Sequence, residues 1–216
     1  MNVYRILRFS FAALVSLMAN ALGTTHFAKG DLIYEIVFDA ASYTVTVGGT
    51  QSVDVLFRET RDGTSVANLA AGGGDGLYAT GFILNYAAVV PGGSLGVSLN
   101  SFTLNDAVDR FDPTFTTSVN DVGAKIFQLN AAARNISDGI EVASFVDAGK
   151  DVYEIKIGTF TFQNNGPNGA ITNLTLGPTS VPFENLLANS SEVSISHYGT
   201  AIVSSVPEPG SLACVL

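Results

Sequence analysis

The sequence predicts an all-β fold: a two-sheet antiparallel β-sandwich with a jelly-roll-like strand order and about nine or ten strands. Short runs rich in Val, Ile, Thr and Phe, with apolar and polar residues in alternation, recur along the chain. Turn-forming pairs such as Gly48-Gly49, Asp62-Gly63 and Gly92-Gly93 separate these runs. Almost no segment has apolar residues at helical spacing, and no repeat of solenoid period is present, which disfavours propellers and β-helices.

Ten runs fit the strand pattern. In order they are residues 32–38, 43–47, 52–59, 77–86, 95–104, 125–129, 140–146, 153–162, 170–176 and 192–203. In the run 153–162, Tyr153 and Ile157 share one face, whereas Phe160 and Phe162 share a face after Gly158. This odd step predicts a β-bulge at Gly158 and a bend there between the two sheets.

The chain divides into a signal peptide over residues 1–23, one sandwich domain over 24–205 and a C-terminal tail over 206–216. The first residues carry Arg5 and Arg8 and no acid, an apolar stretch follows, and Ala19-Asn20-Ala21 provides small residues for cleavage. The apolar stretch is shorter than the roughly 20 residues that span a bilayer. We therefore predict export with removal of the leader, which leaves a length suited to one domain.

Charge and cysteine content exclude several classes of function. The net charge is -9, and removal of Arg5 and Arg8 with the leader makes it -11, so a nucleic-acid partner is excluded. The single cysteine, Cys214, allows no internal disulfide. His26 and His197 lie far apart in the chain, so no transition-metal site of the usual His and Cys type is expected.

An enzymatic function is not predicted. His197 is the sole candidate base for nucleophilic catalysis, because His26 lies beside the cleavage site, and its neighbours Ser194 and Ser196 belong to a predicted strand. The two carboxylates of a glycosidase can come from distant parts of a chain, so the sequence leaves a secreted glycosidase or esterase as an alternative. The glycine-rich stretch 71–76 is followed by neither Lys-Ser nor a helix, which excludes a phosphate loop. We predict no required cofactor.

One acidic stretch is a candidate calcium site. Asp106, Asp109 and Asp112 place three carboxylates in a predicted loop, with Asn120 and Asp121 as further oxygen donors. Calcium takes about six to eight oxygen ligands in flexible geometry. The spacing does not follow the EF-hand pattern, so a solvated acidic loop is the competing interpretation.

The tail carries a sorting motif, Val206-Pro207-Glu208-Pro209, in which two prolines prevent strand pairing and an apolar run follows. It resembles the PEP-CTERM signal of bacterial exported proteins. The resemblance implies an exosortase-type membrane protease as a partner, and contact with the membrane only transiently. Seven residues follow Pro209, without Lys or Arg. We therefore expect an exposed tail and release of the chain as written.

Three stretches, at 41–57, 78–86 and 155–176, resemble the cohesin-like sandwich and the carbohydrate-binding modules that share its architecture. They have the glycine turn between the first two strands, the aromatic-rich strand and the closing hairpin of that family. Residues 104–135 have no clear counterpart. The resemblance implies a non-catalytic exported module of the cell surface or extracellular matrix, for adhesion or carbohydrate binding. A protein-docking module is the alternative, and its ligand would be a surface protein instead of a polysaccharide. The absence of tryptophan disfavours a sugar-stacking cleft.

Overall fold

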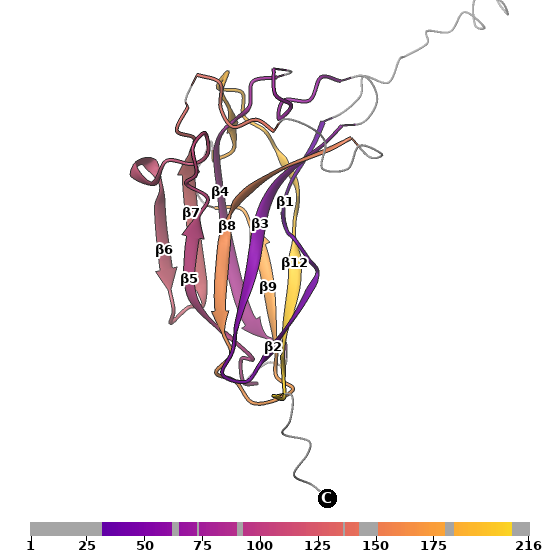
Figure 1. The fold of residues 1–216 in the computed structure, drawn as a ribbon, viewed down its shortest axis with the longest axis vertical. Coiled ribbons are helices and arrows are strands. Elements are labelled where there is room, and N and C mark those ends of the chain that lie inside the picture. The colour runs from indigo at the N-terminus through magenta and orange to yellow at the C-terminus, as the bar shows by residue number, and fades with distance from the viewer. Residues whose placement is uncertain are drawn as a thin grey trace, which may run out of the picture.

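The computed structural model describes residues 32–61, 65–72, 74–89, 93–135, 137–142, 151–179 and 184–208. These residues form a two-layer β-sandwich in which the two sheets face each other across one core (Figure 1). The predicted all-β sandwich is confirmed. The predicted signal peptide and residues 209–216 lie outside the described residues.

The first sheet has five strands in the order β11-β1-β3-β8-β5. Their bounds are β1 Leu32–Phe38, β3 Thr50–Arg61, β5 Ser98–Leu104, β8 Val152–Gln163 and β11 Ile195–Tyr198. The second sheet has the order β2-β12-β9-β4-β7-β6, and β10 pairs with β4 beside this path. Its bounds are β2 Ser42–Thr46, β4 Leu77–Ala88, β6 Thr117–Asp121, β7 Ile126–Ala132, β9 Ile171–Gly177, β10 Leu186–Leu187 and β12 Thr200–Val206.

The first and last of these strands are both interior to their sheets. β1 lies between β11 and β3, and β12 lies between β2 and β9. Each makes one antiparallel and one parallel pairing: β1 is parallel to β11, and β12 is parallel to β2. All other neighbours are antiparallel, so the predicted antiparallel arrangement holds except at these two pairs.

The core consists of the inward-facing residues of both sheets. Strand β3 alternates buried and partly exposed residues, with Val53, Val55 and Phe57 fully buried. At the centre, the Phe160 ring lies 4.8 Å from that of Phe102 and 5.1 Å from that of Phe127 between centroids. Burial of each such side chain stabilises the fold by about 1.5–3 kcal/mol before chain entropy is counted.

Most of the predicted strands are confirmed, and the described residues form twelve strands instead of nine or ten. The prediction missed β6, β10 and a three-residue 3₁₀ helix, η1 (Pro113–Phe115). It also treated residues 192–203 as one strand, whereas they contain β11 and most of β12, which belong to different sheets. The run 140–146 is not a strand in its described part, where Ile140 and Val142 form only isolated bridges.

The bulge at Gly158 is confirmed, but the bend between sheets was placed wrongly. The register of β3 against β8 shifts where Val55 pairs with Gly158 and Leu56 pairs with Lys156, yet β8 stays in the first sheet along its whole length. The change of sheet that falls inside a predicted run occurs at Gly199, which is the single residue between β11 and β12. A Cβ on Gly199 would lie 3.0 Å from the Val37 Cα, so close packing against β1 favours glycine at this corner.

Candidate binding surfaces

The outer face of the first sheet is charged. A row of side chains crosses four strands, because His197 pairs with Glu35, Glu35 with Arg58, and Arg58 with Glu154. Arg58 Nη2 lies 2.6 Å from Glu154 Oε1, and its Nη1 lies 3.8 Å from Glu35 Oε2. The charges on this face are therefore largely compensated within the protein.

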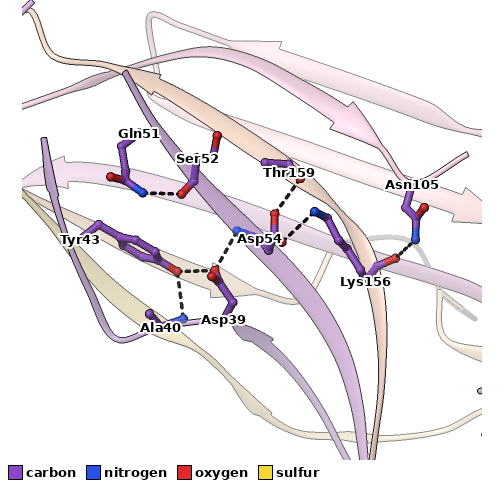
Figure 2. Close-up of polar contacts among 9 residues, drawn as sticks. All are labelled: Asp39, Ala40, Tyr43, Gln51, Ser52, Asp54, Asn105, Lys156 and Thr159. Atoms are coloured by element: carbon purple, nitrogen blue, oxygen red, sulfur yellow. Dashed lines mark hydrogen bonds and ion pairs between the residues drawn. The ribbon is translucent and has the colours of Figure 1, made fainter. Parts of the chain in front are cut away.

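A second polar cluster on the same sheet centres on Asp54 (Figure 2). The Thr159 hydroxyl donates to Asp54 Oδ1 at 2.7 Å, and Lys156 Nζ lies 2.7 Å from Asp54 Oδ2. The backbone N–H of Asp54 donates to Asp39 Oδ1, which also accepts from the Tyr43 hydroxyl at 2.6 Å. Burial, together with the hydrogen bond to Asp39, raises the pKa of Tyr43 well above its ordinary value. These hydrogen bonds connect the corner between β1 and β2 to β3. Both carboxylates, those of Asp39 and Asp54, already have partners within the protein.

The outer face of the second sheet is almost free of charge. Its seven strands hold a single charged residue, Asp121 at the end of β6, in a chain with 19 acidic residues. We call the following outward-facing positions of β2, β12, β9, β4, β7 and β6 the uncharged face: Ser42, Thr44, Ile202, Ser204, Ile171, Asn173, Thr175, Ile83, Asn85, Ala87, Ile126, Gln128, Thr117 and Val119. Two acidic residues border it, Asp121 at the end of β6 and Glu184 over Gly81.

The uncharged face mixes exposed apolar and amide or hydroxyl side chains. Ile171 and Ile202 are 37% and 38% exposed, and their neighbours on the face include Asn173 and Thr175. A pocket lies over this part of β9 and β12. The sequence does not reveal this surface, because each of its strands taken alone is an ordinary strand-like run. Its lack of charge becomes visible only when the strands that share a sheet are known.

Most aromatic side chains are buried, and Tyr78, Phe102 and Tyr198 are partly buried. Among the described residues, Phe115 is the one exposed aromatic, at 68%, and it lies on η1 and not on the face of either sheet. A sugar-binding platform needs exposed rings on which a pyranose can stack. The described faces lack this feature.

The candidate calcium residues do not converge. The Asp112 carboxylate accepts from the Thr114 backbone N–H at 2.8 Å as the N-cap of η1, and this hydrogen bond lowers its pKa. Asp109 sits in the left-handed region with φ of 63°, and the backbone carbonyl of Asp106 accepts from Arg134. Within the described residues, no group of three or more His, Cys, Asp or Glu side chains is placed to hold a metal ion. Calcium binding by this loop stays a prediction.

The residues considered for catalysis are not assembled into a triad. His197 is exposed on β11 opposite Glu35, and the Ser196 hydroxyl donates to the Tyr34 backbone carbonyl. In the glycine-rich stretch, the Gly72 N–H donates to a Glu141 carboxylate at 3.0 Å. An anion cradle would need this N–H group, so the carboxylate supports the exclusion of phosphate binding.

The predicted sorting motif begins at the last residue of the fold's final strand. Val206 is the last residue of β12, is partly buried and pairs with Thr46, so the expectation that it is exposed was wrong. Pairing continues there because the first proline, which lacks the N–H, comes one residue later. Pro207 and Glu208 are exposed, and Pro209 lies outside the described residues. Within the part of the chain that the structure describes, no helix has the length and apolar character needed to cross a bilayer.

No protein-family model matches the chain, and a comparison with curated protein sequences finds no match. Solved structures do match. CaCohA2 from Clostridium acetobutylicum superposes with a TM-score of 0.51 at 9% identity, over 83% of this chain and 92% of that one. The third cohesin of ScaC from Acetivibrio cellulolyticus, solved in complex with the ScaB dockerin, gives a TM-score of 0.44 at 14% identity, over 82% and 99% of the two chains. The first of these likenesses shows that the sandwich has a cohesin-like fold.

Proposed function

We propose that the protein is a non-catalytic docking module that receives a protein partner on its uncharged face. The observation that carries this proposal is the distribution of charge between the two sheets. Depletion of charged residues is the compositional mark of the central part of protein interfaces. An acidic chain that keeps one broad sheet face almost free of charge reduces repulsion of a partner there.

The composition of the face favours a protein over a sugar as the ligand. Exposed isoleucines supply apolar area, and the asparagine, glutamine and threonine side chains supply hydrogen bonds without a charge to desolvate. The absence of exposed aromatic rings on the described sheet faces removes the usual means of binding carbohydrate. The cohesin-like fold supports the same choice at the level of architecture, since such a sandwich offers flat sheet faces.

We also propose that the module acts outside the cell, after export through its leader and recognition of Pro207-Glu208-Pro209 by an exosortase-type protease. A sorting protease needs an accessible peptide. The exposure of Pro207 and Glu208, directly after β12, supports this proposal.

Capture of partner proteins from the secretome of the source, quantified by mass spectrometry, tests the docking proposal. Arginine substituted for Ile202 or Asn85 places a charge in the uncharged face, and Thr161→Arg places the same charge on the outer face of the first sheet. We expect a captured partner to bind Thr161→Arg as it binds the wild type. Its affinity for Ile202→Arg should fall more than about tenfold, because a charge without a counterion would be buried in the interface.

Two results would contradict docking on this face. One is a partner lost equally with both variants. The other is binding to a glycan array that Ile202→Arg abolishes, because the face would then be a carbohydrate site.

A further inference from the structure

The four edge strands of the sandwich are not equally protected. In the first sheet, β5 and β11 are both edge strands and each has a register shift against its neighbour. In the second sheet, β2 is an edge strand whose Val45 carbonyl accepts from Asn164 Nδ2 at 3.0 Å. Bulges and covering side chains of this kind prevent pairing with further strands.

The remaining edge, β6, has none of these protections. All five residues, Thr117-Ser118-Val119-Asn120-Asp121, are exposed, and they pair with β7 without a register shift. The strand contains neither proline nor lysine, and in the described part of the chain no other strand pairs with it. In Figure 1, β6 lies at the margin of the sandwich, outside β7.

The same edge has an unusual amount of exposed apolar surface. Val119 and Val122 are each 63% exposed, and Phe115, shortly before the strand, is 68% exposed. An open edge strand combined with exposed apolar side chains favours association by strand addition.

We propose that β6 pairs with β6 of a second copy of this chain, antiparallel and centred on Val119. In this register Val119 faces its own counterpart, which makes an apolar cross-strand pair. Thr117 faces Asp121 of the other copy, so a hydroxyl donates to a carboxylate at each end. The two Asp121 carboxylates stand roughly 13 Å apart along the strands, beyond the Debye length in physiological salt.

The pairing is isologous, because one strand meets its own copy about a twofold axis. That axis is perpendicular to the sheet, so the two second sheets become one continuous sheet with both uncharged faces on the same side. Phe115 of each copy then lies at the end of the ladder where Val122 of the other copy lies. One five-residue ladder buries a small area, so we expect a dissociation constant in the micromolar range or weaker.

Sedimentation velocity of the exported protein over a concentration series, up to about 200 µM, tests the proposal. We expect a monomer–dimer equilibrium. Val119→Lys places two like charges opposite each other at the axis and should weaken the dimer at least about fivefold, as should Val119→Glu. Val119→Thr, which keeps the β-branched shape, is the matched control. Circular dichroism confirms that each variant is folded.

A mixture of the lysine and glutamate variants gives the decisive result. Because the two positions face each other, the mixture should form heterodimers at least as stable as the wild-type dimer. The proposal is overturned by a wild-type protein that remains monomeric throughout the series, by a dimer that Val119→Lys leaves unchanged, or by a mixture that shows no recovery.

Discussion

Glu59 is the one ionisable carboxyl group that is buried among the described residues. It is fully buried on β3, where Oε2 accepts from the Asn68 backbone N–H at 3.0 Å and Oε1 has no partner among the described residues. Burial raises the pKa of this carboxyl, against hydrogen bonds from the Tyr34 hydroxyl and from backbone N–H groups that lower it. A group of this kind costs stability when it ionises, because its charged form is desolvated in the folded state.

The Glu59→Gln variant should change the pH dependence of stability. The folded-state pKa is raised, so the folded protein binds more protons than the unfolded chain above the ordinary glutamate pKa of about 4.3. The contribution of Glu59 to the stability of the fold is therefore complete below about pH 4.3, the ordinary pKa of glutamate. It is lost as the pH rises through the folded-state pKa. Urea unfolding of both proteins from pH 4 to 8 measures their free energies of unfolding. The value for Glu59→Gln should increase relative to that of the wild type as the pH rises. Exposed Glu192→Gln is the control, and parallel curves for wild type and Glu59→Gln would contradict the prediction.

The bulge in β8 depends on a glycine for steric reasons. A Cβ on Gly158 would lie 2.4 Å from Phe102 Cζ and 2.6 Å from the Thr103 carbonyl oxygen. The ring can move, but the backbone oxygen belongs to the ladder between β5 and β8 and cannot do so without breaking pairing.

We expect Gly158→Ala to lower the free energy of unfolding by roughly 1–3 kcal/mol, the usual cost of overpacking a core. Gly177→Ala on β9 is the matched control, because nothing lies within 4 Å of its Cβ position. Chemical denaturation of both variants measures the difference. Equal stability of the two would mean that the bulge relaxes at no cost.

Local pattern explains which elements the sequence revealed. β3 and β8 alternate along most of their length and bury one face, so their runs were recognisable. β6 is exposed on both faces and has no alternation to detect. The switch of sheets at Gly199 was hidden because extended strand follows this residue directly, as it precedes it, with no turn sequence between β11 and β12. A bulge changes the parity of a strand, whereas a change of sheet does not have to.

At the scale of the whole molecule, the charged and uncharged surfaces are separated by the sandwich itself. This separation was beyond the sequence, because neighbours in a sheet come from distant parts of the chain: β12 lies between β2 and β9. For the same reason, the three aspartates chosen for calcium are close in sequence but are not gathered around one point. The fold class, by contrast, could be predicted from the sequence, because that prediction depends only on how many strand-like runs there are and on their residue composition.

Sorting is tested by expression in the source organism. An extension of about 15 apolar residues and an arginine cluster after the motif should shift the protein towards the cell-surface fraction, because a membrane segment holds it for processing. The control is the same extension with Pro207, Glu208 and Pro209 replaced by alanine. Immunoblots of surface and medium fractions measure the shift. Equal retention of the extended protein and its control would show that the motif is not read.

The interior positions of β1 and β12 bear on how the fold responds to force. The described chain enters the sandwich at one end of its long axis and leaves at the other (Figure 1). Tension applied between those two points would run along both strands, and each is hydrogen-bonded on its two sides. Their ladders would be loaded in shear, with many bonds strained together, instead of being unzipped one at a time. A module held at the cell surface by its tail would have a mechanically resistant attachment built into its first and last strands.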